Sequence, residues 1–319
     1  MNLIIKSIFF TFFILGMIVA KNTIAASFNP IILESVVSLL PDWPKDEAVL
    51  NTKAGAPNDP EGSAVAVFSK GYMATNGHVL GEAKTARVRL NDGRILPAQI
   101  IAKDIATDLA LIKIDLDLPV LTHIKQVELG NSVCAIGNQF GLGLSVTCGV
   151  ISATARTGMG FNPIEDFIQT DTAINPGGSG GALVDQWGQL VGLVSAIFTK
   201  DGNSNIGVNF ATSSALVYRV MEDLRDFGKV IRVKSGLSVR SLTDQQKQNY
   251  SGAEVLRVKD GSPAFIAKLE RKDILTKIAK RIIRKPADVS SAFQFIRFGE
   301  NAKIEFMRNH QLKETTIKF

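Results

Sequence analysis

Short apolar runs separated by turn residues fill the chain between Ser63 and Asn209. Runs such as "AVAVF", "ARVRL", "LALIKI", "VCAIG" and "QLVGLVSAIF" are rich in β-branched residues. The Asp-Gly pair in "LNDGRI" is typical of a hairpin turn, and no long helical pattern is interleaved with the runs. This pattern predicts an all-β sandwich or a pair of barrels rather than a parallel sheet with crossover helices.

Two segments carry helical signals. In "TSSALVYRVMEDLRDFGK" the apolar residues recur at i, i+4 spacing, residues 212–214 offer N-caps and Gly228 offers a stop. A second, short helix is predicted from Asn29 to Leu40, with Pro30 at its first position. The polar, Pro/Gly-rich stretch that follows, up to residue 62, is interpreted as an exposed loop.

The charge of the chain is unevenly distributed. The formal net charge is +6, yet residues 229–319 contain 20 basic against 9 acidic residues, which leaves 16 against 21 in the first 228. This asymmetry predicts a domain boundary near residue 229. We therefore expect a first domain at 63–228, a linker at 229–234 ("KVIRVK") and a second domain of mixed strands and helices at 235–319.

The first 26 residues resemble an export signal. Lys6 precedes an apolar run from Ile8 to Ala20, and small residues around Ala25 and Ala26 offer a cleavage site. The run is shorter than the roughly 20 residues that span a bilayer. We expect a cleaved signal and a periplasmic or cell-envelope protein, and an uncleaved membrane anchor is the alternative. Export permits a disulfide between Cys134 and Cys148, and two buried thiols are the alternative.

The stretch "INPGGSGGALV", residues 174–184, places Ser179 among four glycines. A flexible Gly/Ser linker has polar flanks, whereas the flanks here are β-branched and apolar. The stretch therefore lies inside a folded unit and is a candidate nucleophile loop. A hydrolytic serine also needs a base, a carboxylate that orients the base, and amide donors for the oxyanion.

Candidates for the base and the carboxylate are few. Of three histidines, His78 ends an apolar run in "YMATNGHVL", while His123 and His310 are interpreted as surface or packing residues. Asp108 precedes the run "LALIKI" and would enter the edge of a core. The other nearby acids are interpreted as solvated turn residues: Asp104, Asp115 and Asp117.

Five stretches, in this order, are similar to the HtrA (high-temperature-requirement) serine proteases: "TNGHVL", "TDLALIKID", "AIGNQFGLG", "FIQTDTAINPGGSGGALV" and "GVNFA". The resemblance implies a mostly β fold, with a trypsin-like double six-stranded β-barrel at 63–228 and an α+β PDZ domain at 235–319. It implies His78 as general base, Asp108 as its orienting carboxylate and Ser179 as nucleophile. The amides of Gly177 and Ser179 would form the oxyanion hole. No metal or other cofactor is implied.

The sequence departs from the family at four positions beside the motifs. Glycine replaces the usual Asn or Asp at 178 and the usual Asn at 77, alanine replaces Pro at 182, and Ala64 replaces Gly. None of these changes removes a reacting group. The added glycines predict flexibility beside the nucleophile and the base.

The second domain matches the PDZ pattern in "GAEVLRVKDGSPAFIAKL". The resemblance places the loop that holds a peptide carboxylate at Leu237, Ser238 and Val239, and a bound peptide would add a strand to the sheet edge. Ser238 stands where the family has glycine. Eight cations between Lys268 and Lys285 predict contact with acidic clients or with an anionic membrane surface, and a solvated face is the alternative.

The resemblance implies an ATP-independent serine endopeptidase that degrades misfolded or unfolded envelope proteins, assembled as a homotrimer and regulated by its PDZ domain. Two alternatives remain open. One is a catalytically weak or inactive chaperone or peptide-binding scaffold, and the other is a membrane-anchored regulatory protease that cleaves one signalling protein. Nucleic acid is not an expected partner of an exported protein.

Overall fold

The structure is a computed structural model that describes residues 30–43, 61–124, 127–197 and 207–319. The export signal predicted at 1–26, and most of the loop predicted up to residue 62, lie outside these ranges. In the described part of the chain no helix is long and apolar enough to cross a membrane.

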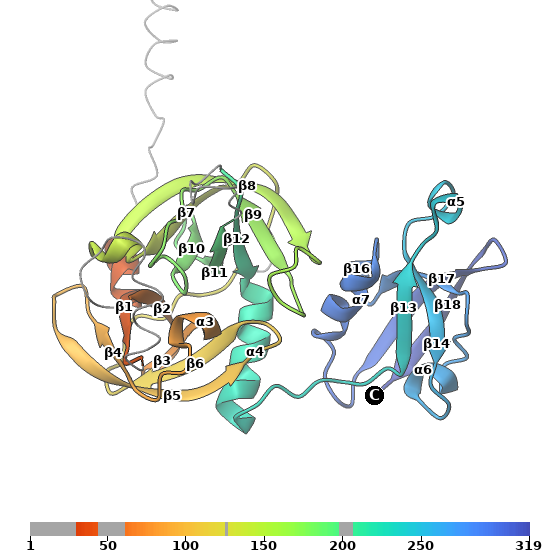
Figure 1. Ribbon diagram of the computed structural model, residues 1–319, viewed down its shortest axis with the longest axis horizontal. Helices are drawn as coiled ribbons and strands as arrows, with labels where there is room; N and C mark the ends of the chain where they lie inside the picture. Colours follow the sequence, from red (N-terminus) through yellow and green to blue (C-terminus); the bar gives the residue numbers. More distant parts are fainter. Residues whose placement is uncertain (1–29, 44–60, 125–126, 198–206) are drawn as a thin grey trace, which may run out of the picture.

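The first barrel closes in the strand order β1-β2-β3-β6-β5-β4 (Figure 1). Every neighbouring pair is antiparallel, and the inward side chains form an apolar core that includes Leu39, Met73 and Ile112. Its strands are β1 (Val36–Pro41), β2 (Gly62–Phe68), β3 (Tyr72–Asn76), β4 (Ala86–Arg89), β5 (Ile95–Asp104) and β6 (Leu109–Ile114).

The helix predicted from Asn29 to Leu40 is wrong over its second half. Only a 3-10 helix, η1 (Pro30–Ser35), forms, and β1 follows it directly. All six residues of β1 are buried, because Val36 pairs with Val65 of β2 while Ser38 pairs with Arg89 of β4. Pairing with two strands that lie far along the chain overrides the local helical signal.

The second barrel closes in the order β10-β11-β12-β9-β8-β7. Cys134 and Cys148 are directly opposite each other on β7 and β8 and form a disulfide with Cα atoms 4.0 Å apart. Two closed six-stranded barrels confirm the predicted β fold. The strands are β7 (Ser132–Gly137), β8 (Ser145–Arg156), β9 (Phe167–Thr170), β10 (Ala182–Asp185), β11 (Leu190–Ile197) and β12 (Asn209–Ser213), with the short η3 (Gln139–Gly141) after β7.

Helix α4 (Ser214–Phe227) forms where the sequence predicts it. The Ser213 hydroxyl accepts a hydrogen bond from the Leu216 amide, and Gly228 ends the helix in a left-handed conformation with φ of 66°. The apolar stripe of α4 packs on the core that the two barrels share, where Leu216, Val220 and Leu224 are buried.

The C-terminal domain is a separate sheet with its own core. The strand order is β13-β14-β15-β17-β18, with β16 paired to β15. Helix α7 (Pro286–Phe293) covers the sheet, and Val289 and Phe293 enter the core. The other elements are β13 (Leu237–Ser241), α5 (Asp244–Lys247), β14 (Ala253–Val258), α6 (Pro263–Ile266), β15 (Ile274–Ile278), β16 (Arg281–Ile282), β17 (Asn301–Arg308) and β18 (Gln311–Lys318).

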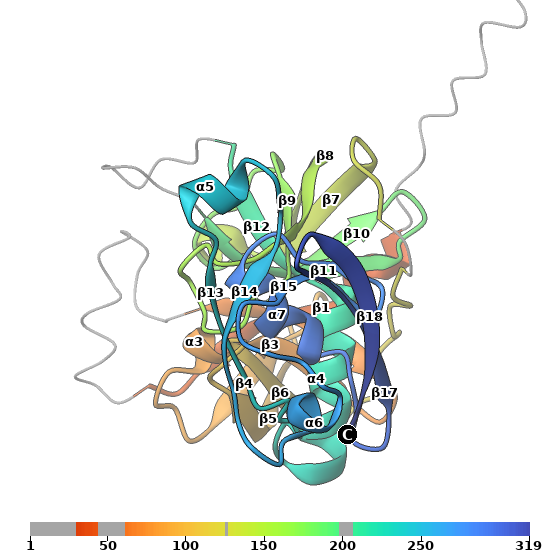
Figure 2. The ribbon, with the colours of Figure 1, turned by 90° about the vertical axis from the view of Figure 1, so that its right-hand side faces the viewer.

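The C-terminal domain lies beside the barrels, with α7 and β16 on the side toward them (Figure 1). Viewed from that end, its sheet stands in front of both barrels and α4 (Figure 2). Polar side chains join the domains: Arg297 of the C-terminal domain pairs with Glu222 and Asp223 of α4, and Arg232 of the segment between the domains pairs with Asp104.

Candidate active site

The register of two strands brings His78 and Asp108 together. His78 lies in α3 (Gly77–Leu80), the short helix that begins where β3 ends, and Asp108 immediately precedes β6. Because Asn76 of β3 is paired with Leu109 of β6, the residues that flank this pair become neighbours. The His78 Nδ1 atom lies 2.6 Å from Asp108 Oδ2.

Backbone contacts fix the orientation of Asp108. The His78 amide donates to Asp108 Oδ1 at 2.8 Å, and the Gly77 amide donates to the Asp108 carbonyl at 3.0 Å. Asp108 itself has a left-handed φ of 54°. A carboxylate that accepts from Nδ1–H leaves the Nε2 lone pair of a neutral imidazole available to take a proton. A Cβ at position 77 would lie 3.1 Å from Asp108 Oδ1, so this carboxylate would have to move by a few tenths of an ångström to admit one.

Ser179 reaches the same region from the second barrel. It lies in the loop between β9 and β10, and the Ser63 amide of the first barrel donates to the Ser179 carbonyl at 2.9 Å. Ser179 is half-buried. Within the described ranges its hydroxyl makes no hydrogen bond to His78. In free enzymes such a bond is often long and tightens only when substrate binds.

Gly177, two residues before Ser179, presents an unpaired amide among the described residues. Gly177 has φ of +87°, and a Cβ there would lie 2.2 Å from the Asn138 carbonyl oxygen, so only glycine fits. The Pro176 carbonyl accepts from the Phe140 amide at 2.7 Å, and the Gly177 carbonyl accepts from Ser63 Oγ at 2.8 Å. Among the described residues, the amides of Gly177 and Ser179 have no acceptor, which leaves both donors for a ligand.

Two supporting residues, Ser63 and Asn76, were not found from the sequence. Ser63 holds the nucleophile loop through both its amide and its hydroxyl, and the hydroxyl also accepts from the Asn138 amide at 2.9 Å. The side-chain amide of Asn76 donates to the Asp108 carbonyl at 3.0 Å and to Ser195 Oγ at 3.2 Å. Each is a polar residue at one end of an apolar strand run, and this position is the sequence signal that could have identified it.

The interpretation of Asp104 as a solvated turn residue is wrong. Asp104 is buried, and its carboxylate accepts hydrogen bonds from Arg232 at 2.5 and 3.0 Å and from Thr107 Oγ1 at 2.6 Å. A buried carboxylate needs such partners. Asp104 therefore ties the first barrel to the segment that leads into the C-terminal domain.

The predicted peptide-binding residues lie on an edge strand. Leu237, Ser238 and Val239 belong to β13, which pairs only with β14 in the sheet of the described C-terminal domain. A bulge lies between Ser238 and Val239. An unpaired edge offers backbone donors and acceptors to an added strand.

The basic segment from Lys268 to Lys285 is partly committed to internal contacts. Arg281 pairs with Asp166 of the second barrel, Lys277 pairs with Glu305, and the Lys285 ammonium donates to the Thr157 carbonyl. It is therefore not simply a solvated face, because two of these contacts connect the domains.

Two six-stranded barrels with a His–Asp pair and a glycine-rich serine loop at their junction define the class of trypsin-like peptidases, here followed by a separate sheet domain. Family models agree, since a trypsin-like peptidase domain matches residues 62–193 and a PDZ domain matches residues 206–319. The chain belongs to the HtrA-type proteases.

The similar proteins include an HtrA-type protease, AlgW, solved with a tripeptide. It is 37% identical, its TM-score is 0.68, and the match covers 90% of this chain and 93% of that one. The periplasmic pH-dependent serine endoprotease DegQ of Escherichia coli (strain K12) is 33% identical over 266 residues, 80% of this chain and 58% of DegQ. A probable serine protease do-like of Buchnera aphidicola is 35% identical over 268 residues, 81% of this chain and 56% of that protein. The chain thus spans a little over half the length of these curated relatives.

Proposed function

We propose that this protein is a serine endopeptidase of the bacterial periplasm that hydrolyses peptide bonds in unfolded envelope proteins without ATP. The observation that carries the proposal is the His78–Asp108 pair, held by a side-chain contact of 2.6 Å and a backbone contact of 2.8 Å at the junction that Ser179 also reaches. The periplasmic names of the relatives support the compartment.

The proposed reaction proceeds through an acyl-enzyme. Ser179 Oγ attacks the scissile carbonyl carbon while His78 Nε2 takes the hydroxyl proton, and Asp108 stabilises the imidazolium that forms. The Gly177 and Ser179 amides donate to the oxyanion. The amine leaves with the proton from His78, and a water molecule, activated by the same imidazole, hydrolyses the ester and restores Ser179.

We also propose that β13 receives an extended peptide as an added strand. Its outer edge is unpaired in the described domain, and Leu237 and Val239 are half-buried, so they offer apolar contacts beside that edge. Assembly as a homotrimer remains an expectation that sedimentation analysis tests directly.

The test compares the mature protein with its Ser179→Ala variant on unfolded casein. The variant removes one hydroxyl from a half-buried side chain, so both proteins should fold alike. We expect casein to be lost with the wild type only, and a fluorophosphonate to label the wild type at Ser179 only. If two folded proteins both leave casein intact and unlabelled, the endopeptidase proposal is wrong and the chaperone or scaffold alternative gains support.

A further inference from the structure

The side chain of Asn76 makes contacts that its place in the chain does not explain. Asn76 is the N-cap of α3, where an asparagine usually accepts from an amide of the first turn, yet within the described ranges it makes no such bond. Its side-chain amide donates instead to the Asp108 carbonyl at 3.0 Å and to Ser195 Oγ at 3.2 Å. Asn76 is fully buried, and among the described residues its Oδ1 atom has no partner. Because a buried unpaired acceptor costs free energy, the two donated bonds are the reason to look for a role of this side chain.

Asp108 has a backbone conformation that needs support. Its φ of 54° is left-handed, a conformation that residues other than glycine seldom adopt. Its carbonyl oxygen accepts from the Asn76 side chain and from the Gly77 amide, each at 3.0 Å. These two donors hold the peptide group that follows Asp108, and the direction of the carboxylate toward His78 depends on that backbone. Asn76 therefore acts on the His78–Asp108 pair through the Asp108 backbone.

The second bond of Asn76 crosses to the other barrel. Ser195 lies in β11 and is buried. Its neighbour in the same strand, Val194, accepts from the Gly180 amide at 2.8 Å. Gly180 directly follows Ser179. A route of hydrogen bonds therefore leads from the Asn76 side chain through β11 to the nucleophile.

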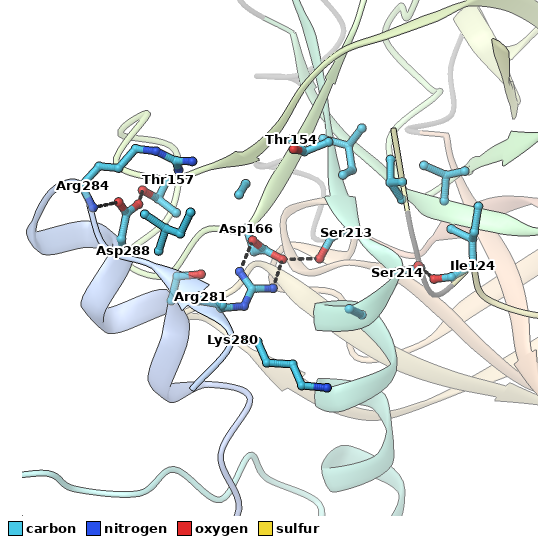
Figure 3. A pocket seen from close by; sticks show the side chains of 17 residues that line it. Ile124, Thr154, Thr157, Asp166, Ser213, Ser214, Lys280, Arg281, Arg284 and Asp288 are labelled. Atoms are coloured by element: carbon cyan, nitrogen blue, oxygen red, sulfur yellow. Dashed lines mark hydrogen bonds and ion pairs between the residues drawn. The ribbon is translucent and has the colours of Figure 1, made fainter. Parts of the chain in front are cut away.

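Other contacts between parts of the molecule have different effects. Ser63 of β2 holds the nucleophile loop directly, through the bond from its amide to the Ser179 carbonyl. The C-terminal domain is held at Asp166 and Asp288, by the contacts that Figure 3 shows. Asn76 takes part in none of these contacts. A substitution of Asn76 therefore tests how the first barrel is aligned with the nucleophile and leaves the domain interface in place.

We propose that Asn76 is a positioning residue that aligns the base and its carboxylate with the nucleophile. Its amide nitrogen, which carries two N–H donors, holds the Asp108 carbonyl in the first barrel and Ser195 Oγ in the second. Because the amide group is planar, it keeps these two acceptors at a fixed separation. This role rests on the proposed endopeptidase function, since the alignment matters only if Ser179 reacts through His78.

The test measures kcat and KM of Asn76→Ala and Ser195→Ala on a chromogenic peptide, beside the wild type. Asn76→Ala removes both bonds, and because a misplacement of about 1 Å can cost about 100-fold in rate, we expect kcat to fall about 10- to 100-fold. KM should change less than about twofold, because the buried Asn76 side chain does not reach a bound peptide. Ser195→Ala removes only the bond between the barrels and should lower kcat about three- to tenfold.

The double variant decides whether the two effects share one route. If Asn76 acts through β11, adding Ser195→Ala to Asn76→Ala should cause no further loss of kcat, whereas two independent defects would add. Circular dichroism and urea unfolding check that each variant is folded under the conditions of the assay. Ser195→Ala loses a single oxygen atom, so it tests the route even if Asn76→Ala fails to fold.

Tyr218→Phe is the matched control. The Tyr218 hydroxyl also donates to a backbone carbonyl, that of Leu121 at 2.6 Å, but it does so from α4. The variant removes one bond of the same kind away from the route and should keep the wild-type kcat.

Labelling of the same proteins with a fluorophosphonate separates this proposal from the proposed function. A wild type that is neither labelled nor active would overturn both. If the wild type is active, a folded Asn76→Ala or Ser195→Ala with unchanged kcat would overturn only the positioning role. The same holds for a change in KM alone, for additive losses in the double variant, and for an equal loss of kcat in Tyr218→Phe.

Discussion

Arg281 of β16 forms a bidentate ion pair with Asp166, a residue that directly precedes β9 in the second barrel. The two N···O distances are 2.7 and 2.9 Å, and 115 positions separate the two residues in the sequence. Asp166 also holds Ser213, the N-cap of α4, through side-chain and backbone contacts. One carboxylate therefore connects the C-terminal domain, the second barrel and the helix between them.

Loss of this pair should destabilise the docked arrangement. Arg281→Ala leaves Asp166, only 4% exposed, without its cation, and we expect a loss of about 2 kcal/mol in the free energy of unfolding. The loss stays below the range for a fully buried pair because Arg281 is 30% exposed. Urea unfolding measures the energy, and small-angle scattering should show a larger radius of gyration. Lys303→Ala, which breaks an exposed pair with Glu314, should change neither by a comparable amount.

Asp108→Asn should impair catalysis far more than folding. The amide side chain no longer favours the His78 tautomer with a free Nε2, so kcat should fall about 10³- to 10⁴-fold. A chromogenic peptide assay measures kcat, and circular dichroism checks the fold. The control is Asp115→Asn, an exposed acid beyond β6, which should retain the wild-type rate. Equal activity of the two variants would contradict the role proposed for Asp108.

Gly177→Ala should disable the oxyanion loop. The new Cβ would lie 2.2 Å from the Asn138 carbonyl oxygen, and φ of +87° is unfavourable for alanine, so the loop must move. Misplacing one oxyanion donor should lower kcat about 100- to 1000-fold. Gly160→Ala is the matched control, because Gly160 also has positive φ, +93°, but its Cβ would meet no atom within 4 Å. Similar kcat values for the two variants would show that the oxyanion loop has no part in the mechanism.

We expect ionisation of Tyr218 to lower the free energy of unfolding in strong alkali. Burial raises the pKa of Tyr218 to about 12, above its usual value of 10.0, and its hydroxyl donates to the Leu121 carbonyl at 2.6 Å. The folded protein holds the Tyr218 hydroxyl proton more tightly than the unfolded chain does. The contribution of Tyr218 to the free energy of unfolding is therefore complete below pH 10 and falls as pH rises toward 12. Urea unfolding between pH 8 and 12 should show that Tyr218→Phe removes this part of the decline. Tyr72→Phe should leave it in place.

The disulfide should stabilise the β7–β8 hairpin. Cys134 and Cys148 are separated by 14 positions, and closing a loop of this length restricts the unfolded chain by about 2–3 kcal/mol. Cys134→Ala/Cys148→Ala should lose a comparable free energy of unfolding. Dithiothreitol should lower the stability of the wild type to that of the double variant and leave the variant itself unchanged. A wild type insensitive to reduction would contradict this role for the bridge.

Patterns that depend on neighbouring residues were sufficient to predict several features. Helix α4 begins and ends at its own caps, Ser213 and Gly228, because both signals act within one turn of the chain. The alternation of short strands and turns predicted an all-β sandwich or a pair of barrels for the same reason, and the resemblance to a family selected the barrels. The helix predicted from Asn29 to Leu40 was wrong because the pairing of β1 depends on residues 62–65 and 86–89, which no local pattern contains.

The sequence by itself determined an all-β first domain, the capped helix and, through its resemblance to a family, the double barrel and the identities of His78, Asp108 and Ser179 as candidates. Only the tertiary structure decided that Asp104 is buried against Arg232, that Cys134 faces Cys148, and that Arg281 crosses to Asp166. These relationships join residues on different strands or different domains. Their geometry depends on how closed barrels and a second sheet pack together, and spacing along the chain does not encode that packing.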